Sequence, residues 1–285
     1  MANMSLTATM LTQRSIIISL LIFSGTIQLS CKKSETKITF SVVREISYGP
    51  DTMNKMDLYL CENYNEKTPL VIIIHGGGWV TGDKSSSVSF AEGFAKNGIL
   101  AANINYRYPN DYTGVHFKEV MNDIGAVTSK LSYLADEYHF RNTGFNMFGH
   151  SSGGHLSLLF AYRNNNSMIL QKVIAYDPVT DLTDTALVND QGMEEVIRTL
   201  VGDSSINAYR DASPFYKADS TSIPTLCFHG TLDEIFPYQQ SVKLIQKLDS
   251  FHIPCKLILL ENSSHFNSND FSLVVSETTA FLKTP

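Results

Sequence analysis

Two patterns of hydrophobic and polar positions succeed each other along the chain. Residues 38–42 and 56–60 alternate apolar and polar side chains, as half-buried antiparallel strands do. Farther along, the apolar residues stand in short unbroken runs, which are typical of strands buried on both faces of a parallel sheet. These runs cover residues 70–74, 99–104, 145–148, 173–176, 225–228 and 256–260.

Helical periodicity fills several of the segments between these runs. It covers residues 117–138, 152–162, 238–250 and 269–282. Strand alternating with helix predicts an α/β fold, a mostly parallel sheet with helices on both faces. No Pro-, Gly- or Ser-rich linker interrupts residues 38–285, so we expect one catalytic domain there. Residues 178–222 lack a clear strand, and we expect a small cap over the carboxyl edge of the sheet, where ligands bind.

The first 30 residues differ from the rest of the chain. Arg14 is their only charged side chain, and an apolar stretch over residues 15–23 follows it. This stretch is shorter than the roughly 20 apolar residues that span a bilayer. A basic start, a short apolar stretch and the small residue Ser30 before a cleavage point predict a secretory signal peptide over residues 1–30. We therefore expect an exported protein, either periplasmic or on the outer surface.

Cys31 directly follows this predicted signal peptide. A Cys after a small residue resembles the lipobox of bacterial lipoproteins, and the resemblance implies that Cys31 is lipidated and becomes the first mature residue. Residues 31–37 would then form a polar spacer between the anchor and the folded domain. Gln28 departs from the lipobox pattern, which has an aliphatic residue at that position, so soluble secretion stays open as the alternative. The chain would contact a membrane only through this anchor.

Composition and charge exclude several classes of function. The 285 residues are 43% hydrophobic, which is too apolar for a disordered chain and enough for a large core. A net charge of −6 argues against nucleic-acid binding through phosphate neutralisation. The four Cys form no disulfide framework, and no CxxC or HExxH pair predicts a zinc site. We expect neither a metal nor a cofactor.

A turn between a predicted strand and a predicted helix carries the first chemical motif. Residues 149–154, with the sequence GHSSGG, stand between the apolar run 145–148 and a helical segment. A Ser in such a turn has a strained backbone, with glycines around it for clearance. Its hydroxyl points out from the sheet at the positive end of the following helix. We therefore predict that Ser151 is a nucleophile.

A glycine-rich loop follows the buried run 70–74. Residues 75–79 have the sequence HGGGW, and successive glycines let backbone N–H groups approach a developing oxyanion without a Cβ in the way. Together with the Ser152 N–H group they could form an oxyanion hole. A phosphate-binding loop is disfavoured because no Lys followed by Ser or Thr stands at P-loop spacing. Trp79 could belong to the core or form a wall of a substrate pocket.

Four motifs, in this order, carry a resemblance to a known family. They are HGGGW at residues 75–79, GHSSGG at 149–154, HGTLD at 229–233 and SHF at 264–266. Together they resemble the α/β-hydrolase esterases and lipases, nearest the hormone-sensitive-lipase-like branch, from about Asp57 onward. The resemblance implies an α/β-hydrolase fold and assigns the oxyanion-hole donors to the N–H groups of Gly77, Gly78 and Ser152.

The acid and the base of a catalytic triad follow from their order in the chain. The α/β-hydrolases place the nucleophile first, then Asp or Glu, then His. Asp233 follows the run 225–228 and His265 follows the run 256–260, so parallel strands would bring both to the same sheet edge as Ser151. His265 would take the Ser proton, while Asp233 holds the imidazole in place. The alternative acids are Asp177, Glu234 and Glu261.

These residues predict a serine carboxylesterase that acts through an acyl-enzyme on a short-to-medium acyl or acetyl ester. The substrate would be a small-molecule or a carbohydrate ester. The same triad would also serve an amide-type hydrolase, such as an arylformamidase or a peptidase, and this alternative stays open. A non-catalytic binding protein on a hydrolase scaffold is the other alternative, although such proteins typically lose the nucleophile or the His. No feature of the chain indicates an oligomeric state.

Overall fold

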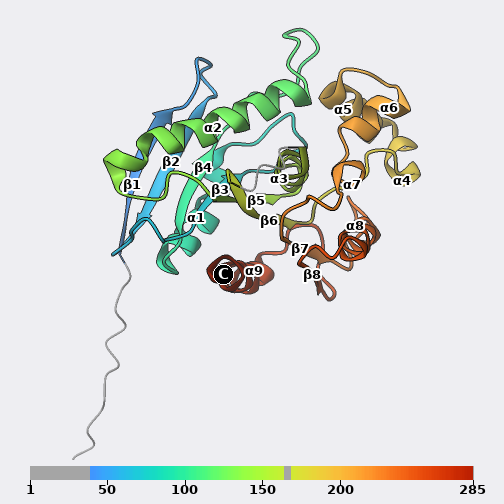
Figure 1. Cartoon of the computed structure of the whole chain (residues 1–285). Helices are drawn as coiled ribbons and strands as arrows, with labels where there is room; N and C mark the ends of the chain where they lie inside the picture. Colours follow the sequence, from blue (N-terminus) through green and yellow to red (C-terminus); the bar gives the residue numbers. More distant parts are fainter. Residues whose placement is uncertain (1–38, 164–167, 285) are drawn as a thin grey trace, which may run out of the picture. The chain divides into compact units, whose positions relative to one another are not determined.

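The strands of the protein form one sheet in the order β1-β2-β4-β3-β5-β6-β7-β8 (Figure 1). The computed structural model describes residues 39–163 and 168–284. The predicted signal peptide, the spacer and Cys31 lie outside these residues, and contacts divide the chain between Lys37 and Ile38. The strands are β1 (Phe40–Ser47), β2 (Lys55–Cys61), β3 (Leu70–Ile74), β4 (Leu100–Ile104), β5 (Phe145–His150), β6 (Leu170–Tyr176), β7 (Thr225–Gly230) and β8 (Cys255–Leu260).

Strand pairing follows the hydrophobic pattern of the sequence. β1 pairs with β2, and β2 with β4, in antiparallel orientation. β3 pairs with β4 and β5 in parallel, and the pairs from β5 to β8 are parallel as well. The edge strand β1 is only half-buried, which explains its alternating sequence, whereas every residue of β3 and β4 is buried. The predicted mostly parallel sheet is confirmed.

Helices cover both faces of this sheet. Outside the segment between β6 and β7, the α-helices are α1 (Val88–Lys96), α2 (Phe117–Tyr138), α3 (Ser152–Arg163), α8 (Gln239–Ser250) and α9 (Phe271–Lys283). Side chains of α2, α3 and α8 share a core with Ile72 and Ile74, while those of α1 and α9 share the other core with Val71 and Ile73. Successive residues of β3 thus point to opposite faces, and both faces are apolar. The helix α1 was not among the predicted helices.

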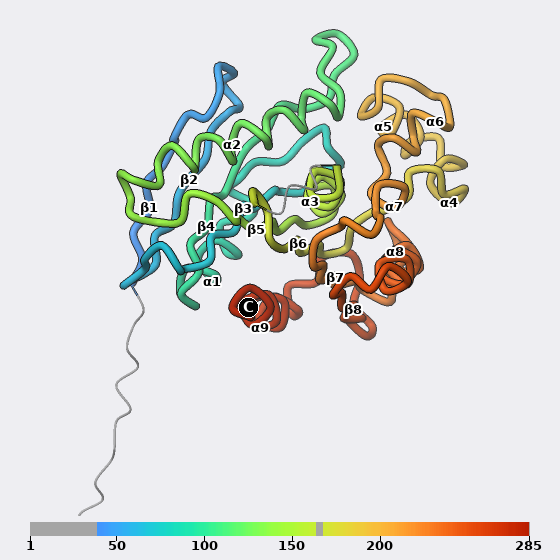
Figure 2. The backbone as a smooth tube through the Cα atoms, viewed as in Figure 1, coloured from blue at the N-terminus to red at the C-terminus, as the bar shows by residue number. Residues whose placement is uncertain are grey.

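The segment between β6 and β7 contains helices and no strand. These helices are α4 (Thr185–Val188), α5 (Gln191–Val201), α6 (Ile206–Asp211) and α7 (Pro214–Lys217). They lie together at one side of the sheet (Figure 2). The Arg163 guanidinium of α3 forms an ion pair of 3.0 Å with Asp211, and Lys247 of α8 donates a hydrogen bond of 2.6 Å to the Phe215 carbonyl. This segment occupies the region predicted to form a cap.

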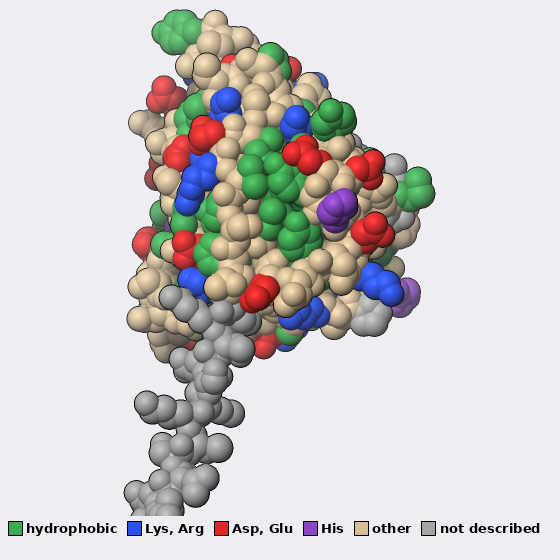
Figure 3. All heavy atoms as spheres, turned by 90° about the vertical axis from the view of Figure 1, so that its left-hand side faces the viewer, with side chains coloured by type: hydrophobic (Ala, Val, Ile, Leu, Met, Phe, Trp, Pro, Cys, Tyr) green, Lys and Arg blue, Asp and Glu red, His purple; other side chains and the backbone are tan. Residues whose placement is uncertain are grey.

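The surface at the β1 end of the sheet carries charges of both signs. Figure 3 shows acidic and basic side chains dispersed around a group of hydrophobic side chains on this face. This face therefore has no large area of a single charge sign that would attract a polyanion or a polycation. Among the described residues, no helix combines the length and the apolar character needed to cross a membrane.

Candidate active site

Ser151 stands where β5 ends and α3 begins. Its backbone has a φ of +56°, an uncommon conformation for a residue other than glycine. The Ser151 N–H group donates a hydrogen bond of 2.8 Å to the Tyr176 carbonyl, which fixes the turn against the end of β6. A side chain at Gly153 would collide with the Ile74 carbonyl of β3, so α3 can start this close to the sheet only because that residue is glycine.

The predicted base and acid meet this serine. His265 Nε2 lies 3.0 Å from Ser151 Oγ, and His265 Nδ1 lies 2.7 Å from Asp233 Oδ2. Asp233 follows β7 and His265 follows β8, as the order of the motifs predicted. The structure thus brings together the three side chains that the sequence singled out, at hydrogen-bond distances suited to proton transfer.

Hydrogen bonds from several groups fix the charge of Asp233. Its Oδ1 accepts the backbone N–H groups of Ile235 and Phe236 at 2.8 and 2.9 Å, and its Oδ2 lies 3.2 Å from His229 Nε2. Burial acts to raise the pKa of Asp233, but the hydrogen bonds from His229, His265 and Phe236 outweigh it and hold that pKa well below its ordinary value. Asp233 is therefore ionised at neutral pH.

The ionised Asp233 changes the basicity of His265. Burial acts to lower the pKa of His265, but the hydrogen bond and the charge of Asp233 more than offset it, so this pKa is raised above 6.5. The nearby carboxylates of Asp177 and Glu234 add to the increase. A more basic imidazole takes the Ser151 proton more readily, while at low pH the same imidazole is protonated and cannot act as a base.

Asp177 joins two segments of the site: the acid loop, which is the HGTLD motif with Asp233, and the base loop, which is the SHF motif with His265. It directly follows β6, has a φ of +48° and is fully buried. Its Oδ1 accepts the Gly230 N–H group at 2.9 Å, and its Oδ2 accepts the Phe266 N–H group at 3.0 Å. The sequence offered Asp177 as an alternative acid, but the geometry puts Asp233, and not Asp177, at His265 Nδ1. Its link between the loops has no signal in the sequence.

The glycine loop lies beside the nucleophile. Gly77 and Gly78 have φ values of +125° and +58°, a region that glycine enters without strain. The Tyr106 hydroxyl donates to the His75 carbonyl at 3.2 Å, and the two rings stack at 4.6 Å, so the start of the loop is fixed. Ser152 is the first residue of α3, where a backbone N–H group has no partner within the helix. The predicted oxyanion-hole donors stand in conformations compatible with that role.

Trp79 lies in the core behind this loop. Its side chain is fully buried, and its Nε1 donates a hydrogen bond of 3.1 Å to His155 Nδ1. The other nitrogen of His155 forms a hydrogen bond of 2.8 Å with the Ala212 carbonyl, between α6 and α7. Trp79 is not among the residues that line the catalytic cavity. The structure therefore gives Trp79 a contact with α3 and, through His155, a link to Ala212, and its predicted place in a substrate pocket remains a prediction.

A cavity of about 420 Å³ opens in front of Ser151, within the size range of small-molecule sites. Ser151, His265 and the glycine loop line it, together with Phe90, His150 and Phe266. Burial lowers the pKa of His150 to about 3, so this ring next to His265 is neutral at physiological pH. The cavity thus presents the nucleophile beside apolar and neutral groups.

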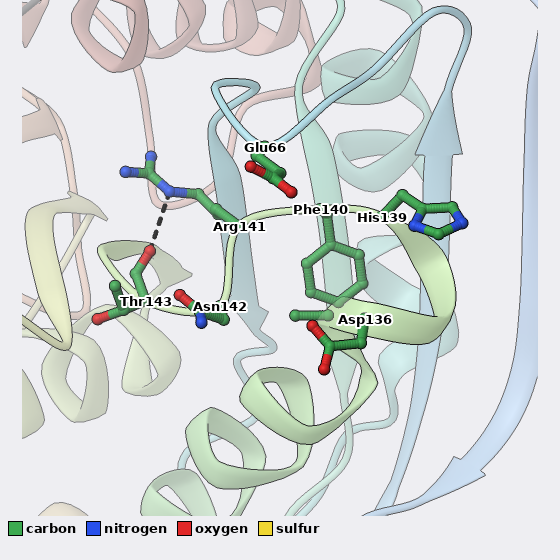
Figure 4. A pocket seen from close by; sticks show the side chains of 8 residues that line it. Glu66, Asp136, His139, Phe140, Arg141, Asn142 and Thr143 are labelled. Atoms are coloured by element: carbon green, nitrogen blue, oxygen red, sulfur yellow. Dashed lines mark hydrogen bonds between the residues drawn. The ribbon is translucent and has the colours of Figure 1, made fainter.

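A polar cavity of about 390 Å³ lies apart from this site (Figure 4). It is lined by Glu66 and by residues 135–136 and 139–143, which precede the strands β3 and β5. It therefore lies at the amino ends of these parallel strands, whereas ligands of open α/β sheets bind at the carboxyl ends. Arg141 extends away from His139 in Figure 4, and its Nε donates to the Thr143 carbonyl at 3.0 Å. We assign this cavity no part in the chemistry.

Comparison with known proteins finds a family model and several relatives that the sequence resembles. The family model BD-FAE matches residues 56–248, more than half of the chain. The esterase LipC of Mycobacterium tuberculosis is 23% identical over 223 residues, which are 72% of this chain and 54% of that protein. Kynurenine formamidase of Danio rerio is 27% identical over 135 residues, 46% of this chain and 43% of that protein. The chain thus spans about half the length of these curated relatives.

Solved structures share the fold. A truncated carbohydrate esterase from gut microbiota superposes with a TM-score of 0.75 at 19% identity, covering 87% of this chain and 97% of that one. Esterase B of Lactobacillus rhamnosis, inhibited by a C6-C4 compound, superposes with a TM-score of 0.70 at 20% identity over 85% of this chain and 87% of that one. At such identities the likeness establishes the α/β-hydrolase fold.

Proposed function

The chain belongs to the BD-FAE family of α/β-hydrolases, and we propose that it is a serine carboxylesterase that works through an acyl-enzyme on Ser151. One observation carries the proposal: the hydrogen bonds from Ser151 Oγ to His265 Nε2 and from His265 Nδ1 to Asp233 measure 3.0 and 2.7 Å. Ser151 and His265 line the cavity of about 420 Å³ beside the glycine loop. The arrangement is that of a nucleophile, a base and an orienting acid.

The reaction follows from these positions. Ser151 Oγ attacks the ester carbonyl carbon while its proton passes to His265 Nε2, and the carbonyl oxygen becomes an oxyanion. The N–H groups of Gly77, Gly78 and Ser152 donate hydrogen bonds to that oxyanion. His265 then gives the proton to the leaving alcohol oxygen as the bond between that oxygen and the acyl carbon breaks. A water molecule then attacks the acyl-enzyme with His265 again as the base, which releases the carboxylic acid and restores the Ser151 hydroxyl.

The size of the cavity and the names of the similar proteins support a small ester substrate. We propose a short-to-medium acyl or acetyl ester of a small molecule or a carbohydrate as the substrate. The volume of about 420 Å³ holds an acyl group of a few carbons together with part of the alcohol. One structural neighbour is titled a carbohydrate esterase, which supports a carbohydrate ester as one option. A panel of acetate, butyrate and octanoate esters measures the acyl preference directly.

Inhibitor labelling tests the nucleophile. A fluorophosphonate probe should attach to Ser151 of the wild type, and Ser151→Ala should lose both the adduct and the hydrolysis of p-nitrophenyl acetate. Ser157→Ala is a matched control, because the buried Ser157 hydroxyl has no hydrogen-bond partner among the described residues. This control should keep both signals. Hydrolysis by Ser151→Ala at the wild-type rate would contradict the mechanism, and absence of any adduct on the wild type would favour a non-catalytic binding protein.

An amide-type hydrolase is the second candidate. The partial similarity to a kynurenine formamidase supports it, and the triad geometry serves both reactions. Comparing p-nitrophenyl acetate with p-nitroacetanilide and an N-formyl arylamine separates them. If kcat/KM for an amide exceeded kcat/KM for every ester, the protein would be an amidase and not an esterase.

We further propose that the protein is exported and anchored through a lipid on Cys31. The proposal rests on the order of Arg14, the apolar residues 15–23, Ser30 and Cys31 in the sequence. Growth with a labelled fatty acid should label the wild type but not Cys31→Ala. Cys61→Ala is the control, because Cys61 is buried in β2. Equal labelling of the wild type and Cys31→Ala would exclude this anchor and leave soluble secretion.

A further inference from the structure

A second cavity adjoins the catalytic one. It measures about 240 Å³ and shares three lining residues with the catalytic cavity, namely Ser86, Phe90 and Phe266. It continues beyond them to Tyr176 and Phe271. The two cavities are therefore neighbours, and the side chains of Phe90 and Phe266 belong to the walls of both.

The walls of this second cavity are aromatic. The Phe90 ring lies 5.2 Å from the ring of Phe271, 6.4 Å from that of Tyr176 and 6.5 Å from that of Phe266. Rings at these distances pack in tilted or edge-to-face pairs, which are favourable arrangements. Four rings thus line the cavity together with Ser86, Ser89, Asn267 and Ser268, and the space among the rings suits one cyclic apolar group.

Phe266 is held in an unusual way between the two cavities. Its φ is +56°, which is a strained conformation for an aromatic residue, and its side chain remains 48% exposed. The Asp177 carboxylate accepts the Phe266 N–H group, and the ring lies 4.6 Å from that of His150. Strained residues kept in place by their surroundings concentrate at functional sites. An exposed ring that is fixed in this way is a wall that a ligand can pack against.

The chemistry decides which part of an ester reaches this cavity. The leaving alcohol oxygen must lie within hydrogen-bond distance of His265, because His265 protonates it. The alcohol part therefore lies on the base side of Ser151, and Phe266 is the residue that follows the base. A cavity of about 350 Å³ on the acid side shares only Ile235 with the catalytic one and is lined by polar groups such as Asp233 and Glu234.

We propose that the second cavity is a subsite for the alcohol part of the ester, and that it selects alcohols carrying an apolar ring. The proposal rests on the esterase function proposed above and adds the part of the site that determines specificity for the alcohol. Phe90 and Phe266 act as specificity-determining residues between the two cavities. An ester of a ring-bearing alcohol then gains binding energy from this cavity that an ester of a small alcohol does not.

Two isomeric esters test the proposal. Benzyl acetate carries a phenyl ring on its alcohol, methyl phenylacetate carries it on its acyl group, and methyl acetate carries none. For the wild type, kcat/KM for benzyl acetate should exceed that for methyl acetate by about ten-fold or more, since even one methylene group in an apolar pocket is worth about ten-fold. Methyl phenylacetate should lack this advantage.

Filling the second cavity should remove the advantage. Ser89 is exposed and lines the second cavity but not the catalytic one, so Ser89→Trp should lower kcat/KM for benzyl acetate to the level of methyl acetate and leave methyl acetate unchanged. Ser268→Trp fills the same cavity from the segment after β8 and should have the same effect. Ser129→Trp, on an exposed position of α2, is the matched control and should keep the wild-type values.

The outcomes separate the subsite from the proposed function. The subsite is wrong if benzyl acetate is no better a substrate than methyl acetate, if both filling variants leave its kcat/KM unchanged, or if they affect methyl phenylacetate instead. If the wild type hydrolyses none of the three esters nor p-nitrophenyl acetate, the esterase function itself fails, and the subsite with it. Hydrolysis of all three esters without preference overturns the subsite alone.

Discussion

Replacing Asp177 by Asn should slow hydrolysis and lower the pKa of His265. The Asp177 carboxylate accepts the Gly230 N–H group at 2.9 Å and the Phe266 N–H group at 3.0 Å, so it joins the loops that bear Asp233 and His265. An Asn side chain offers one acceptor oxygen and an amide that only donates. One of the two backbone N–H groups would therefore lose its acceptor and face a donor.

The size of the effect follows from these two bonds. A hydrogen bond to a charged group contributes about 1.5–3 kcal/mol, and a buried donor left without a partner costs about 1–3 kcal/mol. Asp177→Asn should therefore lower the free energy of unfolding by about 2–4 kcal/mol, and Asp177→Ala, which removes both bonds, should lower it by more. A shift of the base by about 1 Å relative to the nucleophile would reduce kcat by about 100-fold.

The pH profile gives a readout that loss of stability alone would not produce. The charge of Asp177 contributes to the raised pKa of His265, after the larger contribution of Asp233. Removing that charge lowers the pKa of His265. Since the neutral imidazole is the active base, kcat/KM falls as pH decreases through this pKa, and the acidic limb should move to lower pH in Asp177→Asn.

The assay is kcat/KM for p-nitrophenyl acetate across pH, together with urea unfolding. Asp249→Asn removes the same charge from an exposed position of α8 and is the matched control. It should match the wild type in both measurements. If Asp177→Asn also shows the wild-type acidic limb and the wild-type kcat/KM, the inferred link between the acid and base loops is wrong.

Three further changes test other parts of the site. The wild-type kcat/KM should decrease with falling pH around a pKa above 6.5, because the hydrogen bond that His265 donates to Asp233 and the charge of Asp233 outweigh the effect of burial on His265; a midpoint below 6.5 would contradict this expectation. Asp233→Asn should reduce kcat by up to about 10⁴-fold, because an amide favours the wrong imidazole tautomer, and an unchanged kcat would point to another acid. Trp79→Phe removes the donor to the buried His155 Nδ1 and should lower the free energy of unfolding by about 1–3 kcal/mol, which an unchanged urea midpoint would refute.

Much of the fold could be predicted because burial leaves its mark on sequence. Residues 70–74 form a buried parallel strand that coincides with the predicted run, since both of its faces are covered by helices. The predicted run 99–104 differs from the observed strand β4 only at residue 99, which precedes the strand. The helix α1 was not predicted although its buried residues Phe90, Ala91, Phe94 and Ala95 have helical spacing, because its nine residues fall short of the length of about 10–12 that separates a helix from a short apolar run.

Some residues of the candidate site could also be predicted from the sequence, and others could not. Ser151, Asp233 and His265 could be singled out because each follows an apolar run and because the order of the motifs is specific. The linking position of Asp177 depends on three strand ends lying side by side, and no local pattern encodes that. The second cavity depends on α1, α9 and the residues after β8 meeting, so no pattern in the sequence marked Phe90, or Phe266 of the SHF motif, as part of it.

The strained backbone of the site explains why these strand ends must be adjacent. Ser151, Asp177 and Phe266 have φ values of +56°, +48° and +56°, and each such conformation costs about 1–3 kcal/mol for a residue other than glycine. Each is held by a bond to a neighbouring element. The Ser151 N–H group donates to the Tyr176 carbonyl at 2.8 Å, and the Asp177 N–H group donates to the Phe228 carbonyl at 2.9 Å.

The Phe266 N–H group completes the series, because its acceptor is the Asp177 carboxylate at 3.0 Å. The end of β6 therefore holds the nucleophile turn through Tyr176 and the base loop through Asp177, and the same carboxylate holds the acid loop through Gly230. A perturbation at the end of β6 should reach all three members of the triad, whereas one within a single loop should reach only that member. The geometry of catalysis is thus set at a strand end that supplies none of the reacting groups.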